Sequence, residues 1–473
     1  MSGTVDHHAP AGDSPDGADV PVGGSADDSV VTPTGGGAHG LDLRPGAVLW
    51  AVAALGTALR LAWVFVVGRL PTGWSDPFFY WASGISIARG DGYRTFLGGA
   101  TAYYPPGYPF FLGGIYRITS GLGIDGWPLW PVGVAQSLLW GAAIVLIGLT
   151  GRVLVGRRAG VVAALIVACW PNLIAYAGSL MSESLFVAAF GAFVFGSTVV
   201  ARTWQRGVVH GRTVWVSGVS AAVALAIATM VRPQVLLAVP AVALAWLLGG
   251  LGWRRVLVAA LVAAVALAAF IVPWTIRNQS VFGHPVLIST NTGDNLCIGF
   301  EPDARGGFAL PEGCRSGTNW GRGPAGEYEQ DRFGRQRAAE FVVTDPLRLP
   351  ALTVRKLFYT YVSDDDGLRA TEAYGSDPVG AEWFRTGWKI VSNVFYAAVM
   401  VAALVGLAIA TLRGWRRRDA ALLATVTITL SGMLVPVLFF GDPRFKVATA
   451  PMFALLAALT WSRWFDREAQ PAG

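Results

Sequence analysis

Long runs of residues with almost no charge recur along this chain, and they restrict what it can fold into. A helix needs about 20 apolar residues to cross the hydrocarbon core of a bilayer. Only 14% of the 473 residues are charged, whereas a soluble domain usually carries about 25%. The runs lie at 46–68, 131–151, 159–181, 185–201, 214–231, 234–252, 256–275, 390–412, 420–440 and 447–462. The sequence therefore predicts an all-α polytopic membrane protein with about ten transmembrane helices.

Clusters of arginine follow every second apolar run. They lie at Arg152, Arg157 and Arg158, at Arg202, Arg206 and Arg212, at Arg254 and Arg255, and at Arg413, Arg416, Arg417 and Arg418. Because short loops rich in Lys and Arg stay in the cytoplasm, this pattern predicts cytoplasmic termini and two large outer loops, 69–130 and 276–389. The same clusters explain the net charge of +6, so we expect no nucleic-acid partner.

The charge pattern and composition divide the chain into five segments. Residues 1–43 are rich in Gly, Asp, Ser, Pro and Ala and contain no Lys or Arg, which predicts a disordered cytoplasmic tail. An N-terminal transmembrane module, 44–275, includes the first outer loop, and an extracytoplasmic loop follows at 276–389. The C-terminal transmembrane helices occupy 390–464, and 465–473 form a second cytoplasmic tail.

Each outer loop has an organisation of its own. The apolar stretch at 110–118 is too short to span a membrane and follows three prolines, so we interpret it as part of a juxtamembrane or re-entrant hairpin. In the second loop, 328–343 and 347–361 are predicted to be helices. Pro346 separates them, because the residue before a proline avoids the helical region. The second helix is amphipathic and is expected to lie on the outer leaflet.

Two of the three cysteines, Cys297 and Cys314, lie in the second outer loop, while Cys169 lies in an apolar run. An oxidising outer compartment permits disulfides, and the segment between the two loop cysteines contains several glycines. We predict a disulfide between Cys297 and Cys314, with two free thiols as the alternative. Cys169 is expected to be an inert, small apolar residue.

Polar residues gather at the predicted outer ends of the runs, whereas most run centres carry no ionisable group, which counts against a proton-coupled transporter or ion pump. These residues are Asp76, Glu183, Arg60, Arg232, Arg277 and Arg444. Arginines neutralise phosphate oxygens and an acid can accept a proton, so the set suggests a site for a phosphorylated lipid. Simpler explanations exist: loop acids are commonly solvated, Arg232 and Arg277 can reach lipid headgroups, and Arg60 can stand at the interface.

Two further segments have both a functional and a structural interpretation. The run Asp364-Asp365-Asp366 resembles a cation site, but we interpret it as a solvated acidic turn. The segment YYPPGYP at 103–109 forms either a rigid turn or an aromatic wall against a sugar. No His, Cys and Asp residues have the spacing of a metal site, so we predict no cofactor and no required metal.

No single motif in this chain is specific for a family, but several separated motifs follow one another in a specific order. They are Asp76 with Tyr80 after the first run, ARGDGY at 88–93, YPPGYP at 104–109, MSES at 181–184, VRP at 231–233, PWTIRN at 273–278, STNTGDN at 289–295 and DPRF at 442–445. In this order the chain resembles the GT-C superfamily of polyprenyl-phosphate-sugar-dependent glycosyltransferases. It is most similar to bacterial members related to glycosyltransferase family 39, which includes protein mannosyltransferases and aminoarabinose transferases.

The resemblance implies a GT-C-type fold, with juxtamembrane helices in the first outer loop and a large outer loop before the last three helices. Asp76 occupies the place of the family's catalytic acid and would be the general base for an acceptor hydroxyl. The hydroxyl oxygen would attack the anomeric carbon of a sugar on polyprenyl phosphate, with inversion of configuration. The residues expected to bind substrate are Tyr80, Tyr104, Glu183, Arg60, Arg232, Arg277 and Arg444.

The implied enzyme is a hexosyl- or pentosyltransferase of the plasma membrane with its active site outside. Its partners would be the polyprenyl-phosphate sugar, an acceptor protein, lipid or glycan, and the membrane. Relatives often have two adjacent acids where this chain has Asp76-Pro77, so dependence on a divalent metal stays open. The alternatives are a flippase for lipid-linked sugars, another membrane transporter, or a non-catalytic scaffold. A scaffold has no need for Asp76, Glu183 and the outer arginines to converge.

Overall fold

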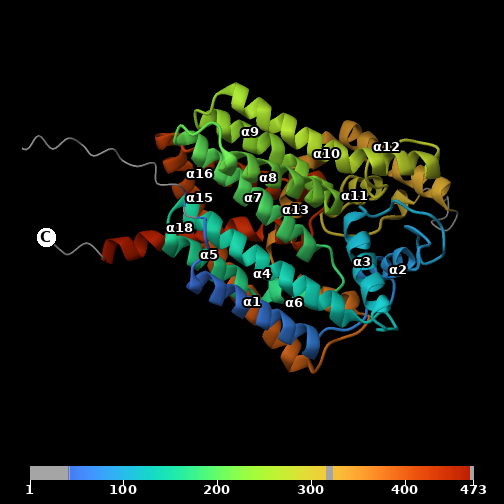
Figure 1. The fold of residues 1–473 in the computed structure, drawn as a ribbon. Coiled ribbons are helices and arrows are strands. Elements are labelled where there is room, and N and C mark those ends of the chain that lie inside the picture. The colour runs from blue at the N-terminus through green and yellow to red at the C-terminus, as the bar shows by residue number, and fades with distance from the viewer. Residues whose placement is uncertain (1–40, 42, 316–322, 469–473) are drawn as a thin grey trace, which may run out of the picture. The chain divides into compact units, whose positions relative to one another are not determined.

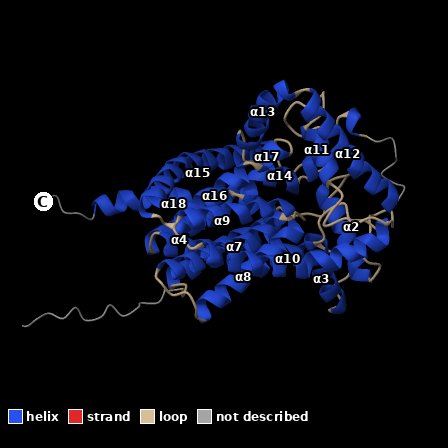
Figure 2. Ribbon diagram, turned by 90° about the horizontal axis from the view of Figure 1, so that it is seen from above, coloured by secondary structure: helices blue, strands red, loops and turns tan. Residues whose placement is uncertain are grey.

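The computed structural model describes residue 41 and residues 43–315 and 323–468, and Figure 1 draws the remainder as a grey trace. The predicted tail at 1–43 therefore lies outside the described residues except for 41 and 43. Of the predicted tail at 465–473, residues 465–468 continue the last helix, and the rest lies outside the described part. The described chain is built from helices joined by loops and short turns (Figure 2).

Among the described residues, ten α-helices end by residue 282 and eight follow it. They are α1 (Ala47–Val66), α2 (Asp76–Arg89), α3 (Gly107–Gly121), α4 (Leu129–Leu154), α5 (Arg157–Cys169), α6 (Pro171–Ala175), α7 (Glu183–Gln205), α8 (Arg212–Val231), α9 (Ala238–Leu248), α10 (Trp253–Phe282), α11 (Thr292–Gly299), α12 (Pro324–Thr344), α13 (Leu349–Tyr361), α14 (Asp366–Thr371), α15 (Glu382–Arg417), α16 (Ala420–Met433), α17 (Val435–Leu438) and α18 (Ala450–Glu468).

All ten predicted apolar runs are helical, but not all are long enough to span. Within the part of the chain that the structure describes, seven segments have the length and composition of a membrane span: α1, α4, α7, α8, α10, α15 and the α16–α17 segment. An eighth, α5 with the α6 segment, is bent by 58°, at the point where Pro171 interrupts the helix. The remaining two runs, 234–252 and 447–462, form shorter apolar helices, Pro233–Leu248 and the first part of α18. The count of ten spans is therefore not confirmed, because seven described segments qualify by length and composition, or eight with the bent pair.

The arginine-rich loops meet at one end of the bundle. Arg202, at the end of α7, pairs with Asp419 at 2.7 Å and donates to the Leu154 carbonyl at 2.9 Å. Arg255, at the start of α10, donates to the Trp204 carbonyl at 3.4 Å. These contacts join the loops that follow α4, α7, α9 and α15, so the segments with Glu183, Arg232 and Arg277 lie at the opposite ends of their helices.

We expect the arginine-rich end to face the cytoplasm, and this can be tested by single-cysteine labelling. In a Cys169→Ser background, Leu347→Cys should react with a membrane-impermeant thiol reagent in intact cells, because Leu347 is 91% exposed and lies in the second outer loop. Arg157→Cys, Arg254→Cys and Arg417→Cys should react only after the membrane is permeabilised. Labelling of any of these three in intact cells would contradict the predicted orientation.

The first outer loop folds into the hairpin of α2 and α3. Helix α2 begins with Asp76 and Pro77, where a missing N–H is tolerated, and ends at Gly90, whose φ of 89° is the left-handed conformation common after a helix. The apolar stretch at 110–118 lies in the 15-residue helix α3, which packs against α2. Together with α11 and α12, this hairpin lies at the end of the bundle away from the C-terminal end of α18 (Figures 1 and 2).

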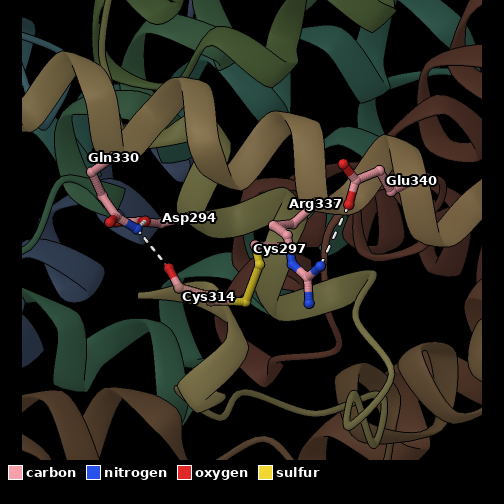
Figure 3. Close-up of a disulfide and its surroundings, with 6 residues drawn as sticks. All are labelled: Asp294, Cys297, Cys314, Gln330, Arg337 and Glu340. Carbon is pink, nitrogen blue, oxygen red and sulfur yellow. Dashed lines mark hydrogen bonds and ion pairs between the residues drawn. A yellow bond between two sulfur atoms is a disulfide. The ribbon is translucent and has the colours of Figure 1, made fainter. Parts of the chain in front are cut away.

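The two helices predicted in the second outer loop are present as α12 and α13. Helix α12 ends before Asp345, and α13 begins after Pro346. Cys297 of α11 is bonded to Cys314, with Cα atoms 5.7 Å apart (Figure 3). Gln330 of α12 donates to the Cys314 carbonyl at 2.7 Å, so the disulfide segment is tied to α12. On α13, Val354 and Phe358 are 68% and 60% exposed, which favours contact of this helix with the outer leaflet.

Candidate active site

Asp76 is the first residue of α2, where the free N–H groups of the first turn favour a carboxylate. Its Oδ1 accepts a hydrogen bond of 2.7 Å from the Tyr104 hydroxyl. Its Oδ2 forms an ion pair with Nη1 of Arg444. The side chain is 31% exposed, so the carboxylate is held by two partners but remains accessible to an incoming molecule.

Glu183 is the first residue of α7 and binds two arginines. Its Oε1 accepts from Nε of Arg444 at 2.6 Å and also pairs with Nη2 of Arg232. Arg232 in addition donates to the Ser182 hydroxyl at 3.2 Å. Because both guanidinium groups contact the same oxygen atom, the two cations lie next to each other, an arrangement that can bind a phosphate group.

These four side chains form a continuous chain of charges, Asp76–Arg444–Glu183–Arg232, which we call the ionic network. Side-chain exposure falls along it, from 31% at Asp76 and 17% at Arg444 to 1% at Glu183. Two acids balance two arginines, which is the condition under which buried charges are tolerated. The gradient leaves Asp76 as the member that a substrate can reach most easily.

Arg444 is positioned by the short helical turn η6 (Pro443–Ala448). The Asp442 side chain caps this turn by accepting from the Arg444 N–H at 2.9 Å. The preceding Gly441 donates its N–H to the Gly306 carbonyl of the second outer loop at 2.7 Å. Lys446 of the same turn is 2% exposed and pairs with Asp364 at 3.2 Å. The outer loop therefore holds the backbone that carries Arg444.

The acidic run at 364–366 is not the solvated turn that we predicted. Asp364 and Asp366 are each 1% exposed, because α14 packs against α6 and the short helical turn that follows it. Asp364 accepts from Nε1 of Trp170 at 2.6 Å, and Asp366 accepts from the Tyr176 hydroxyl. Burial, together with the neighbouring Asp442 carboxyl, raises the pKa of Asp366 to about 7. The partners lie far away in sequence, so no local pattern could have predicted them.

A cavity of about 180 Å³ adjoins the network. Two lining residues, Glu327 and Gln330, come from α12. The others are mostly aromatic or hydroxyl residues of α2 and the segments on either side of it: Trp74, Phe79, Ser83, Tyr93, Thr95, Phe96, Leu97, Thr101, Tyr103 and Tyr104. Tyr104 both lines this cavity and donates to Asp76. The Glu327 carboxylate is occupied by Thr101, Thr290 and the Ala102 N–H at 2.6–2.9 Å. Aromatic faces with a few polar groups are typical of a binding site for a small molecule.

Tyr80 and Arg277 stand beside these groups and not in the network. Tyr80 is 4% exposed, and its ring packs against that of Tyr104, with the ring centres 4.8 Å apart. Arg277 donates to the backbone carbonyls of Thr101 and Tyr93 at 2.7 and 3.1 Å. The structure therefore places Arg277 where it holds the backbone of the cavity wall.

The structure does not bring Arg60 to the network. Its side chain is fully buried, and it donates to the carbonyls of Val167 and Ala168 at 2.9 and 3.1 Å. The last carbonyls of a helix have no partner within it, and the bend at Pro171 leaves these two at the end of α5. Arg60 satisfies them, with its guanidinium 4.7 Å from the centre of the Trp140 ring. This placement gives Arg60 a structural role in joining α1 to α5.

The described residues offer no group of three or more His, Cys, Asp and Glu side chains that could hold a metal ion. The charges around Asp76 are instead balanced by arginine. The chemistry that the site can support with its own groups is therefore proton acceptance by a carboxylate and stabilisation of an anion by two guanidinium groups.

Comparison with known proteins gives no match to a family model or to a curated protein. Solved structures match in fold. The apo oligosaccharyltransferase from Archaeoglobus fulgidus covers 89% of this chain and has a TM-score of 0.52 at 16% identity, and this chain spans about half of its length, 50%. The same enzyme tethered with an acceptor peptide covers 89% of this chain and 50% of its own, with a TM-score of 0.51 at 13% identity.

A further solved structure, ArnT from Cupriavidus metallidurans bound to undecaprenyl phosphate, overlaps 88% of this chain and 79% of its own at a TM-score of 0.38 and 16% identity. The overlap with the oligosaccharyltransferase confirms the predicted GT-C-type fold of a multi-pass membrane protein.

Proposed function

We propose that this protein is an inverting glycosyltransferase that moves a sugar from a polyprenyl-phosphate donor to an acceptor hydroxyl at the outer face of the plasma membrane. The observation that carries the proposal is the convergence of Asp76, Glu183 and Arg444 from three separate segments. A non-catalytic scaffold would not require a carboxylate, paired arginines and a cavity to meet at one end of the bundle. The GT-C-type fold, shared with an oligosaccharyltransferase, also supports it.

In the proposed reaction, Asp76 takes the proton of the acceptor hydroxyl while the hydroxyl oxygen attacks the anomeric carbon. The bond between that carbon and the phosphate oxygen breaks, and its electron pair leaves with the polyprenyl phosphate. Arg444 and Arg232 bind the phosphate and stabilise the charge that develops on it. A single displacement of this kind inverts the anomeric configuration.

The roles of the two acids follow from their surroundings. Glu183 is 1% exposed and its Oε1 is shared by both arginines, so we assign to it the positioning of the phosphate-binding groups. Asp76 is 31% exposed, and the Tyr104 hydroxyl that it binds lines the cavity. We therefore assign the proton to Asp76 and the sugar to the aromatic cavity, where Tyr104 can contact both.

The proposal is tested with the purified protein in liposomes that contain a polyprenyl-phosphate monosaccharide, mannose being the first to try. Serine and threonine peptides and lipid-linked glycans serve as acceptors. We expect polyprenyl phosphate to be released in step with product, and NMR of the product to show the opposite anomeric configuration from the donor. Movement of intact donor across the bilayer without cleavage would favour the flippase, and retained configuration would exclude the proposed single displacement.

A further inference from the structure

A second cavity, of about 240 Å³, lies between α7, α8, α9 and α10. On α8 its lining extends from Val214 to Leu225, whereas Arg232 of the ionic network follows the last residue of that helix. Arg232 is seven positions beyond Leu225, which corresponds to about 10 Å along a helix. The cavity is therefore at the arginine-rich end of the bundle, separate from the candidate active site.

The lining is apolar along its length and charged at one end. On α10 it begins with Arg254 and Arg255 and continues through valine and alanine residues to Ala263. Between Arg254 and Ala263 the helix rises by about 13 Å. One leaflet contributes about 15 Å of hydrocarbon, half of the bilayer core. The apolar part of the cavity thus has the length of an acyl chain from one leaflet, with cations at the level of the headgroup.

Helix α10 leaves this cavity accessible from the side. Within an apolar stretch of 18 residues in α10, only 6% of the residues are buried within the protein. Three side chains that line the cavity, Trp215, Val219 and Val258, are 52%, 46% and 47% exposed. In a protein that spans a membrane, such a surface faces lipid, and an apolar chain fills an apolar cavity more favourably than water does.

The two arginines at the open end of the cavity indicate the charge of the lipid that it binds. The Arg254 side chain is exposed, with its guanidinium 5.5 Å from the centre of the Trp253 ring, and Arg255 makes only the 3.4 Å hydrogen bond to the Trp204 carbonyl. Within the described part of the chain, neither arginine forms a salt bridge with a carboxylate. Basic pockets between transmembrane helices bind anionic headgroups.

We propose that this cavity binds one acyl chain of an anionic phospholipid, with its phosphate against Arg254 and Arg255. A zwitterionic lipid would gain less from two arginines than a lipid with net negative charge. A polyprenyl-phosphate donor does not fit this position, because its sugar has to reach Asp76 at the other end of the helices. The site therefore lies outside the sugar-transfer reaction, and its occupation can be measured without any turnover.

The test is native mass spectrometry of the full-length protein in a nonionic detergent, titrated with phosphatidylglycerol or phosphatidylcholine. We expect tighter binding of phosphatidylglycerol. Arg254→Gln combined with Arg255→Gln should weaken it by about tenfold or more, since both cations assigned to the anionic headgroup are lost. The matched control, Arg416→Gln with Arg417→Gln, changes two exposed arginines of the same end that do not line the cavity and should leave the affinity unchanged.

A cavity-filling variant tests the acyl-chain part of the proposal independently of charge. Gly218 lines the cavity, and a Cβ added there would meet only Val200, at the ordinary contact distance of 3.8 Å. Leucine also favours the helix relative to glycine, so Gly218→Leu should fold and should lower phosphatidylglycerol binding. Equal affinity for the two lipids, or unchanged binding in both variants, would overturn the assignment.

Discussion

Replacing Asp76 by asparagine is expected to lower the rate of sugar transfer by about 10²–10⁴-fold, the usual contribution of a general base. An alcohol is a weak nucleophile near neutral pH, so removal of its proton during attack matters. The amide of the variant would not be able to accept that proton, although it keeps the size of the side chain and one oxygen for the Tyr104 hydroxyl. Donor binding should be nearly unchanged, because the phosphate is assigned to the arginines. The measurement is single-turnover transfer in liposomes, with donor binding determined separately.

Two other carboxylates serve as controls for this prediction. Asp91 is exposed at the end of the same hairpin, so Asp91→Asn should retain nearly full activity. Glu183→Gln should lie between the two, because it weakens the positioning of Arg232 and Arg444 without removing the base. Near-normal turnover by Asp76→Asn would refute the assignment of the base. An inactive Glu183→Gln beside an active Asp76→Asn would move that role to Glu183 at the start of α7.

The sequence predicted those features of the fold that depend on one-dimensional patterns. Apolar runs predicted the helices, and the arginine clusters predicted which helix ends lie together, since Arg202 and Arg255 join neighbouring loops of the same end. Span length was predicted less well, because Pro171 bends one apolar run, and the apolar helices of two others are shorter than a span although their composition looks continuous. Hydropathy does not report the direction in which a helix continues after a proline.

Most of the candidate site was predicted from polar residues that stand close to an apolar run, whereas Tyr104, which binds Asp76, was predicted from the YYPPGYP segment and the family resemblance. Asp76, Glu183, Arg232 and Arg444 have this position, and the structure brings them together. Arg60 has a similar sequence environment, but it binds backbone carbonyls that the bend after α5 leaves without partners. Such a role depends on a break in another helix, which lies far away along the chain. For the same reason, sequence reasoning could not predict that the acidic run before α14 is buried.

Replacing Arg444 by methionine is expected to impair both stability and transfer, because Arg444 joins the accessible acid to the buried one. Removing one partner of a fully buried ion pair costs about 3–5 kcal/mol. The side chains of Arg444 and Asp76 are 17% and 31% exposed, so we expect a smaller loss of about 2–4 kcal/mol in the free energy of unfolding. Arg69→Met is the matched control, since it breaks the pair with Asp377 whose side chains are 32% and 34% exposed, and should cost about 0–1 kcal/mol.

A double variant separates the structural role of Arg444 from its proposed role in binding phosphate. In Arg444→Met with Asp76→Asn, the network keeps Glu183 and Arg232, which pair directly with each other, and the side chain that lost Arg444 carries no charge. Stability should therefore recover in part, as measured by the midpoint of thermal unfolding in detergent. Binding of the polyprenyl-phosphate donor should stay about tenfold or more weaker than in Asp76→Asn alone, because one guanidinium assigned to the phosphate is missing. If donor binding returned together with stability, Arg444 would have only a structural role, and the phosphate would have to be bound by other groups.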